Sequence, residues 1–456
     1  MSKEINKKYS MNMCEGPILK KMLLFALPLM ASSVLQLLFN AADIIVVGRF
    51  AGDNSLAAVG STSSLINLLV NLFVGLSVGA NVLTAQFFGA RKEKELSSTV
   101  HTAIAISIVS GILMTIVGIV GAPIILRLMK TPAEVLDLAV VYLRTYFLGM
   151  TAMMVYNFGA AILRAVGDTR RPLYFLVTAG VINVVFNLFF VIVLKWGVFG
   201  VGLATTISQI ISATLIIRCL MKEQSGIQIQ LRNIRIHKDK LLKILQIGLP
   251  AGFQGTLFSL SNVFIQSSVN LFGATVVAGN SAASNIEGFV YASMNAFHQA
   301  AMSFTSQNYG AKKYERINKI LFVAEGCVIV VGTVLGLGAV AAGPVLLRIY
   351  TTSSDVVAAG MVRLGIICTT YALCGVMDVF VGSLRGMGYS VVPMIVSLIG
   401  ACATRLIWLA TVFQIDRFHR IETVYIIYPI SWIMTATAHA ISYVIVRRKV
   451  GKGVKS

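Results

Sequence analysis

Charged residues are scarce in this chain, and acidic residues are the scarcest. Asp and Glu together number 18 in 456 residues, and charged residues make up 12% of the chain, against about a quarter in soluble domains. With 57% hydrophobic residues and a mean hydropathy of +0.82, the chain has too little polar surface for a soluble protein of this length. These values exclude a soluble globular fold and predict a protein embedded in a lipid bilayer.

Histidine and cysteine are also few, and neither type forms a cluster in the sequence. The cysteines lie in or beside apolar stretches, without the spacing of metal ligands or disulfide frameworks, so we interpret them as packing residues. They are Cys14, Cys219, Cys327, Cys368, Cys374 and Cys402. No catalytic cluster or dyad is visible, and we expect a protein that is not an enzyme and needs no cofactor or metal.

The formal net charge of +20 comes from 38 Lys and Arg, which fall in every second connecting segment instead of gathering in one patch. A nucleic-acid partner is therefore not expected. By the positive-inside rule these segments are cytoplasmic, and both termini are predicted to be cytoplasmic with them. The first apolar stretch, from Leu19 onward, lacks a signal-cleavage sequence and is expected to be a retained span.

Twelve apolar stretches are long enough to cross a bilayer as helices, which takes about 20 residues each. They fall near 18–48, 55–85, 97–126, 134–160, 172–195 and 199–221, and then near 244–271, 276–306, 318–347, 356–382, 391–413 and 424–446. The predicted fold is all-α and polytopic. It has an N-lobe over residues 1–221, a basic cytoplasmic linker over 222–243 and a C-lobe over 244–456.

The two lobes carry an internal repeat. The pair LP at 27–28 matches LP at 249–250, QFFGARK at 86–92 matches QNYGAKK at 307–313, and LRAVG at 163–167 matches LRGMG at 384–388. All three pairs are separated by almost the same length of sequence, which indicates two six-span halves of one origin. An even number of spans gives both halves the same topology, related by pseudo-two-fold symmetry along the membrane normal, with a ligand site expected between them.

Acidic side chains within spans are costly and are candidates for function by default. Asp43 lies in the first span, where Asn40 and Gln36 share its helix face. Glu287 in the eighth span and Asp378 in the tenth are further candidates for ion coupling. Polar residues on helix faces are candidates for substrate binding, although such amides often serve only to bond neighbouring helices. These candidates are Gln36, Asn40, Asn67, Asn157, Asn262, Gln266, Tyr291 and Asn295.

Each of these acids also has a structural interpretation. Asp43 could simply end the first span among lipid headgroups, because Arg49 follows shortly. Asp378 could form an ion pair with Arg405, the main cation within the eleventh span. His439, in the twelfth span, is typical of a core histidine with its hydrogen bonds satisfied.

Together the motifs resemble those of the multidrug and toxic compound extrusion (MATE) family. The resemblance rests on the LP pair of spans 1 and 7, DIIVVGRFAG at 43–52, QxxGA(R/K)K after spans 2 and 8, and LRxxG after spans 4 and 10, and it covers essentially the whole chain. It implies a V-shaped pair of six-helix lobes that export organic, often cationic, compounds in exchange for protons or sodium ions.

The resemblance also implies an ion site in the N-lobe. The first-span aspartate of the family falls on Asp43, and its fifth-span pattern Asn-x-x-x-Asp falls on Asn183 and Asn187. An amide therefore replaces the second acid, which favours a proton over a sodium ion near Asp43. Glu287 matches an acidic position of the eighth span, whereas Asp378 does not match the tenth-span acid of the family in its distance from the LRxxG motif.

The sequence thus predicts a secondary active multidrug efflux transporter that works by antiport with H+ or Na+. It is expected to be a monomer in the bacterial cytoplasmic membrane, with small organic and often cationic substrates. The alternative is a lipid-linked oligosaccharide or lipid flippase of the same superfamily. Such a protein would be expected to line its cleft with several cations, whereas Arg405 is the main one in this chain.

Overall fold

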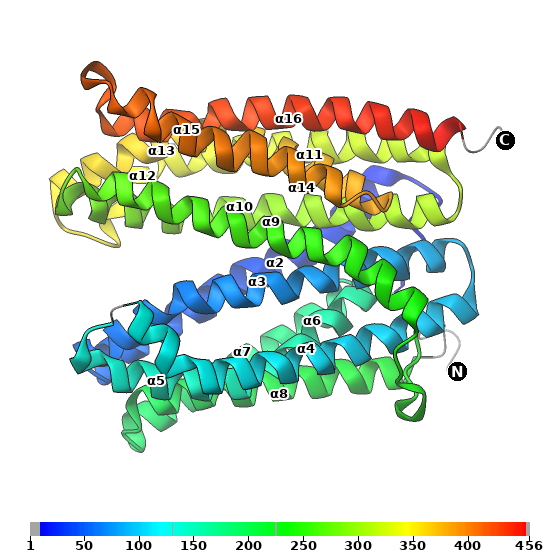
Figure 1. The fold of residues 1–456 in the computed structure, drawn as a ribbon, viewed down its shortest axis with the longest axis horizontal. Helices are drawn as coiled ribbons and strands as arrows, with labels where there is room; N and C mark the ends of the chain where they lie inside the picture. Colours follow the sequence, from blue (N-terminus) through cyan, green and yellow to red (C-terminus); the bar gives the residue numbers. More distant parts are fainter. Residues whose placement is uncertain (1–9, 130, 224–225, 453–456) are drawn as a thin grey trace. The chain divides into compact units, whose positions relative to one another are not determined.

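The computed structural model describes residues 10–129, 131–223 and 226–452, so the outermost residues at both ends of the chain lie outside the described part. Every regular element within these ranges is a helix (Figure 1), which agrees with the predicted all-α class. Long apolar stretches without internal turn signals favour helices because a bilayer offers no other partner for backbone hydrogen bonds.

In the first half of the chain, long helices follow one another with short connections. They are α2 (Ile18–Phe50), α3 (Asp53–Gly89), α4 (Glu93–Leu128), α5 (Ala133–Leu148), α6 (Met150–Ala165), α7 (Arg170–Leu188) with the π-helix η1 (Phe189–Val193), and α8 (Gly197–Met221). A short connection with the 3-10 turn η2 (Leu231–Asn233) leads into the second half.

The second half follows a similar order, with one long helix, α13, where the first half has the bent pair α5 and α6. It comprises α9 (Lys238–Asn270), α10 (Ala274–Gly310), α11 (Tyr314–Ala341), α12 (Gly343–Arg348), α13 (Ser354–Gly386), α14 (Val391–Ser397), the π-helix η3 (Leu398–Ala403), α15 (Thr404–Ala410), the 3-10 turns η4 (Val412–Gln414) and η5 (Asp416–Phe418), and α16 (Ile421–Lys452).

Nine continuous stretches of helix in the described residues are long and apolar enough to span a membrane, and α5 with α6 forms a tenth span bent by 45°. Helices α9 and α10 are long enough, with 33 and 37 residues, but are less apolar than the others. They carry several of the polar residues that were selected as candidates, including Gln266 and Glu287. With these two, the helices account for the twelve spans predicted from the sequence.

The internal repeat is visible in the backbone conformation. Gly167 and Gly388, the last residues of the two LRxxG motifs, have φ values of 92° and 91°. Arg91 and Lys312, within the two QxxGA motifs, have φ values of 55° and 57°. A positive φ is uncommon outside glycine, so its recurrence at corresponding positions of the repeat shows that both halves turn in the same way.

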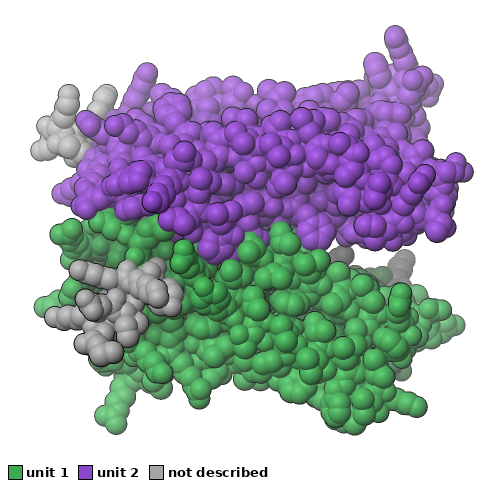
Figure 2. All heavy atoms as spheres, turned by 180° about the vertical axis from the view of Figure 1, so that it is seen from behind, with its two compact units in different colours: residues 1–12, 31–252 green, residues 13–30, 253–456 purple. Residues whose placement is uncertain are grey.

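By their internal contacts the residues form two compact units (Figure 2). Unit 1 comprises residues 1–12 and 31–252, and unit 2 comprises residues 13–30 and 253–456. The divisions fall inside α2 and α9, two residues after Pro28 and Pro250 respectively. Each of these two helices therefore contributes its first part to one unit and its remainder to the other.

Close contact between α3 and the first part of α9 builds unit 1. A Cβ on Gly75 would lie 2.3 Å from the Cα of Gly252, and one on Gly79 would lie 2.3 Å from the carbonyl oxygen of Ile244. A Cβ on Gly248 would lie 2.6 Å from the Cα of Leu76. Small residues on both helices allow their backbones to approach, which is a common basis of helix association in membranes.

In unit 2, α11 and α13 pack in the same manner. A Cβ on Gly336 would lie 2.2 Å from the carbonyl oxygen of Cys368, and one on Gly332 would lie 3.0 Å from the Cα of Ala372. The contact fixes the face of α11 that points toward α13, on which Val328 and Leu321 are buried.

We expect the Gly252→Ala variant to be destabilised by about 1–3 kcal/mol, because the added Cβ would overpack the contact between α3 and α9. Thermal unfolding of the purified protein in detergent measures the effect. Gly338→Ala in α11 is the control, since nothing lies within 4 Å of its added Cβ, and it should unfold like the wild type. Equal loss of stability in both variants would contradict the interpretation.

Candidate functional site

The carboxylate of Asp43 lies where α2 meets α7 in unit 1. One helical turn before it, the ring of Phe39 packs against α7 at Gly180, where a Cβ would come within 2.0 Å of the ring. Glycine at this position lets the two helices approach. Asp43 follows Phe39 by one turn, and Asn183 follows Gly180 by one turn. The contact between Phe39 and Gly180 therefore sets how closely α2 and α7 approach at Asp43 and Asn183.

Asp43 accepts a hydrogen bond from the amide of Asn187, with a distance of 2.6 Å from Nδ2 to Oδ1. Asn187 is fully buried, and Asn183 is 5% exposed. Asn183 in turn donates to the hydroxyl of Thr205 on α8, at 3.4 Å. The structure therefore brings together the three N-lobe residues that the sequence analysis assigned to ion coupling, and it adds Thr205.

Two amide oxygens of this cluster, and a third one farther along α8, are buried without a hydrogen-bond partner in the described residues. They are Oδ1 of Asn183, Oδ1 of Asn187 and Oε1 of Gln209. The Gln209 oxygen occupies the place that a Cβ would take at Gly149, the residue between α5 and α6. Buried acceptors without donors are costly. A proton carried by Asp43 would let its hydroxyl donate to one of the two asparagine oxygens, and a small cation would be attracted to both.

The helix geometry changes directly after this cluster. The π-helix η1 begins at Phe189, two residues after Asn187, and continues to Val193. Single π-turns interrupt the regular hydrogen bonding of a helix and occur frequently at functional sites. The end of α7 is thus irregular at the level of the predicted ion site.

In unit 2, Glu287 on α10 forms a two-pronged ion pair with Arg363 on α13. The distances are 2.8 Å from Nε to Oε1 and 2.7 Å from Nη2 to Oε2, and both side chains are buried. Arg363 also donates to Asn280 and lies over the rings of Tyr425 and Tyr428. This arrangement engages both carboxylate oxygens of Glu287 and gives the residue a structural role, so its part in ion coupling stays a prediction without geometric support.

Asp378 on α13 interacts with the hydroxyl of Tyr291 and lies near the guanidinium of Arg385. Its backbone carbonyl accepts a hydrogen bond from Nδ1 of His298, at 2.6 Å. Within the described residues Asp378 forms no ion pair with Arg405. The suggested pairing of these two residues is therefore wrong.

Arg405 is stacked between aromatic rings instead. Its guanidinium lies 4.3 Å from the ring centre of Tyr428 and 6.0 Å from that of Trp432, and its Nε donates to Ser431. The aromatic series continues from Trp432 to Tyr371 and on to Tyr291, with ring centres 5.4 Å and 6.4 Å apart. Stacking compensates the charge of Arg405 where a carboxylate was expected.

The substrate-binding candidates differ in their surroundings. Gln36, Asn40, Asn67 and Asn262 are exposed, and Tyr291 is 40% exposed. The amide of Asn157 bonds the carbonyl of Met153 within its own helix. Gln266 bonds Asn270 and Asn280, and Asn295 is half-buried. Their role in substrate binding stays a prediction, although Asn157 and Gln266 already have partners inside their own units.

His439 is fully buried and ends a chain of side-chain hydrogen bonds. Arg385 donates to Gln254 at 2.8 Å, Gln254 donates to Ser397 at 3.2 Å, and Ser397 lies 3.0 Å from Nε2 of His439. Its Nδ1 has no partner in the described residues. His439 is therefore a core histidine that is satisfied on one side only.

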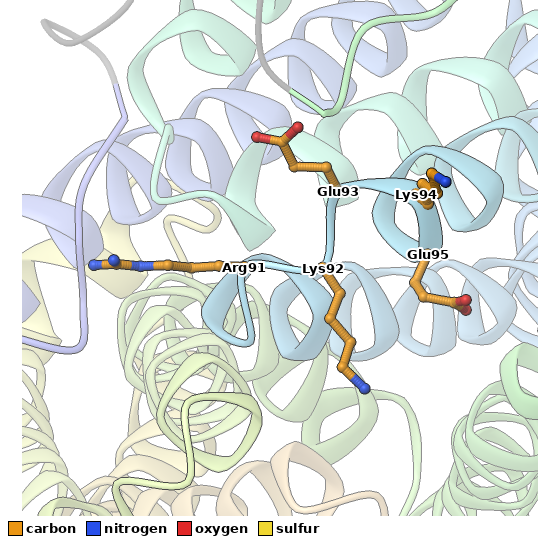
Figure 3. A pocket seen from close by; sticks show the side chains of 5 residues that line it. All are labelled: Arg91, Lys92, Glu93, Lys94 and Glu95. Carbon is orange, nitrogen blue, oxygen red and sulfur yellow. The ribbon is translucent and has the colours of Figure 1, made fainter.

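A surface hollow at the turn between α3 and α4 is unrelated to these clusters. It is lined by five consecutive residues, 91–95, of both charge signs. Their side chains point in different directions (Figure 3) and do not converge on a common point. Within the described residues there is also no group of His, Cys, Asp and Glu placed to hold a metal ion.

The sequence analysis missed Arg363, Thr205 and Gln209. Arg363 lies near the start of the predicted span 356–382 and was not considered as a candidate. The sequence did contain an indication of it, because a glutamate inside a membrane-spanning helix needs a cationic side chain at the same level of the bilayer. Thr205 and Gln209 are one turn apart on α8, a spacing that places them on one face.

Two units of long helices, each with polar clusters inside membrane-spanning segments, define the class of multi-pass membrane transporters. A model of the MatE family matches residues 28–189 and 250–409, which is most of the chain and includes both halves of the repeat. The chain belongs to this family, and it is a transporter and not an enzyme. The family predicted from the motifs is thereby confirmed.

Known proteins resemble the chain over nearly its full length. The probable multidrug resistance protein YoeA of Bacillus subtilis is 26% identical over 436 residues, which cover 94% of this chain and 92% of that protein. The probable multidrug resistance protein YpnP of the same organism is 28% identical over 84% of this chain and 86% of its own length. A crystal structure of a MATE protein in complex with MaL6 has the same fold, with a TM-score of 0.89, 23% identity and coverage of 97% and 99%.

We expect Glu287→Met and Arg363→Met to destabilise the protein by about 3–5 kcal/mol each, because each leaves a buried charge without its partner. The double variant should recover much of this loss, since it removes both charges together. Thermal unfolding in detergent measures all three, with Arg348→Met, an exposed arginine of α12, as the control. A double variant as unstable as the sum of the single variants would contradict a structural ion pair.

Gly180→Ala should lower the unfolding temperature, because its Cβ would collide with the Phe39 ring and cost about 1–3 kcal/mol. The second change Phe39→Ala makes room and should restore part of the loss. Gly60→Ala in α3, with nothing within 4 Å of its Cβ, is the matched control. If Phe39→Ala brings no recovery in the Gly180→Ala background, the contact does not set the spacing of α2 and α7.

Proposed function

We propose that the protein exports small organic compounds from the cell by secondary active antiport, with Asp43 as the coupling carboxylate. The observation that carries the proposal is the hydrogen bond from Asn187 to Asp43, where the Oδ1 atoms of Asn187 and Asn183 are buried without donors. One negative charge surrounded by acceptors suits the uptake of one monovalent cation. The names of YoeA and YpnP, both probable multidrug resistance proteins, support drug-like substrates.

The proposed exchange follows from charge balance. A carboxylate in surroundings of low polarity is costly when it is ionised and unpaired. It is relieved by a proton, by a sodium ion or by a cationic substrate, and one charge can be compensated by only one of them at a time. Mutually exclusive occupancy of this kind is sufficient for antiport. Asn187 in place of a second acid favours the proton, since it leaves a single carboxylate for the ion.

The energetics suffice for useful transport. Each unit of pH difference across the membrane corresponds to about 1.36 kcal/mol for each coupled proton. An exchange of one proton for one monovalent cation moves no net charge, so the membrane potential does not contribute. One proton could then sustain about a tenfold substrate gradient for each pH unit.

Unit 2 would contribute aromatic surface to substrate recognition. Tyr291 is partly exposed, stacks on Tyr371 and interacts with Asp378. Flat cations bind to aromatic faces with a nearby carboxylate. We therefore assign Asp378 and Tyr291 to the substrate and keep the coupling ion at Asp43.

The proposed transporter is a monomer in the bacterial cytoplasmic membrane, with both termini in the cytoplasm. The flippase alternative is not favoured, because Arg405 is engaged by Tyr428 and Trp432.

Ethidium efflux from proteoliposomes tests the coupling ion. We expect wild-type efflux under an imposed pH gradient and much less under an imposed sodium gradient. Asp43→Asn should abolish efflux under either gradient, because an amide can take up neither cation. Asp53→Asn, which changes an exposed acid in the first turn of α3, is the control and should behave like the wild type.

The alternatives give separate results. Efflux driven by sodium alone would assign Na+ to Asp43 in place of the proton. Wild-type efflux in Asp43→Asn would remove Asp43 from the mechanism. Protein without gradient-driven efflux of ethidium or of other organic cations would overturn the antiport function itself.

A further inference from the structure

Glu325 is an acidic residue in the middle of a membrane-spanning helix to which no role has been assigned so far. It lies eleven residues after Tyr314, the first residue of α11, and therefore about 16 Å along a helix that rises about 1.5 Å per residue. The surrounding sequence, FVAEGCVIVVG, is otherwise apolar. It was not among the candidates selected from the sequence.

The carboxyl group of Glu325 is enclosed and without a partner. Both of its oxygen atoms are inaccessible to solvent, and no described residue offers either of them a hydrogen bond. Within the described residues it forms no ion pair with any charged side chain. It differs in this respect from Glu287, whose two oxygens are both bonded to Arg363.

Several charged and titratable groups of the neighbouring helices α10, α13 and α16 have partners of their own. They are Glu287 with Arg363, His298 with the carbonyl of Asp378, Asp378 with Tyr291, Arg385 with Gln254, and Tyr443 with Asn318. Arg447 of α16 bonds Asn318 and the carbonyl of Tyr314. Asn318 precedes Glu325 by two turns on the same face of α11, about 10 Å along the helix axis, and Arg447 forms no ion pair with Glu325 in the described residues.

The internal repeat shows the type of residue that fits this position when only packing matters. Ile104 of α4 occupies the position in the first half that corresponds to Glu325 in the second. The two helices also correspond in space, because Gly111 of α4 meets Thr151, and Gly332 of α11 meets Ala372 at the equivalent place in the repeat. Ile104 is 1% exposed and belongs to the hydrophobic core of unit 1. Unit 2 thus carries an acid where unit 1 has an aliphatic core residue.

Such an acid is stable only in its neutral form. An ionised carboxylate without donor, water or counter-ion in hydrocarbon-like surroundings is strongly disfavoured, whereas a protonated carboxyl is tolerated. We propose that Glu325 is a second proton-binding site, in unit 2, that holds a proton in this conformation and exchanges it when the packing of α11 opens. The exchange rests on the proposed function, because it serves transport only in a proton-coupled cycle, but proton binding itself is measurable without transport.

The first experiment detects the bound proton chemically. Dicyclohexylcarbodiimide is an apolar reagent that adds to protonated carboxyl groups. The acid proton moves to a reagent nitrogen, the carboxylate oxygen bonds to the central carbon, and an acyl shift leaves a stable N-acylurea without loss of any atom. We expect mass spectrometry of the detergent-solubilised full-length protein to find this adduct on Glu325 at neutral pH, with a yield that falls as the pH rises.

Two variants make the labelling specific. Glu325→Gln should lose the adduct from the peptide that contains residue 325. Glu315→Gln changes an exposed acid of the same helix and should leave the labelling of Glu325 unchanged. An unlabelled Glu325 over the whole neutral pH range, in a protein that is labelled elsewhere, would show that the carboxyl is not a protonated, apolar site.

The second experiment asks whether the proton is exchanged. Ethidium added to unbuffered, detergent-solubilised protein should release protons, and Glu325→Gln and Glu325→Ile should release fewer than the wild type or Glu315→Gln. Glu325→Ile copies the residue found in the other half of the repeat and keeps the site packed if the amide variant folds poorly. Proton release and a pH profile of efflux equal to the wild type in Glu325→Ile would overturn the exchange.

Failure of this inference and failure of the proposed function are distinguishable. If the wild type shows no gradient-driven efflux while Glu325 is labelled in the expected manner, proton binding stands and antiport falls. If the wild type exports ethidium under a pH gradient and the Glu325 variants match it, the antiport function stands and Glu325 is removed from it.

Discussion

A lipid bilayer offers no hydrogen bonds, and this constraint governs the placement of every polar side chain in the protein. Unit 2 satisfies it by pairing charges inside the protein, as between Glu287 and Arg363, or by covering a cation with aromatic rings, as at Arg405. Unit 1 satisfies it only partly at Asp43, where amide oxygens are left without donors. The incomplete satisfaction at Asp43 is the property that a coupling site needs, because a fully bonded carboxylate has no affinity left for an ion.

The two halves show how a duplicated fold can be used in different ways. Backbone turns at Gly167 and Gly388 are the same, and the glycine contacts of α4 and α11 coincide. The side chains inside the shared framework have diverged, with Ile104 in one half and Glu325 in the other. A common scaffold therefore supports a single-carboxylate cluster in unit 1 and, in unit 2, both the paired charges of Glu287 and Arg363 and the unpaired acid Glu325.

The sequence was sufficient to predict the helical class, the number of spans and the family, because hydropathy and repeated motifs report directly on these features. It also predicted that Asp43, Asn183 and Asn187 lie together, through the resemblance. The sequence could not predict which side chains of different helices form pairs. Which cation pairs with Glu287 depends on the rotation of α13 about its own axis. The hydrophobic pattern of each single span does not determine that rotation. The misassigned pair of Asp378 and Arg405 has the same origin.

Helices α2 and α9 are each shared by both units, and in each helix the division falls two residues after a proline. Proline has no backbone N–H to donate, and its ring crowds the preceding turn, so the helix bends more easily there than elsewhere. Both prolines belong to the LP pairs of the internal repeat, so the same easily bent turn recurs at corresponding positions of the two halves of the chain.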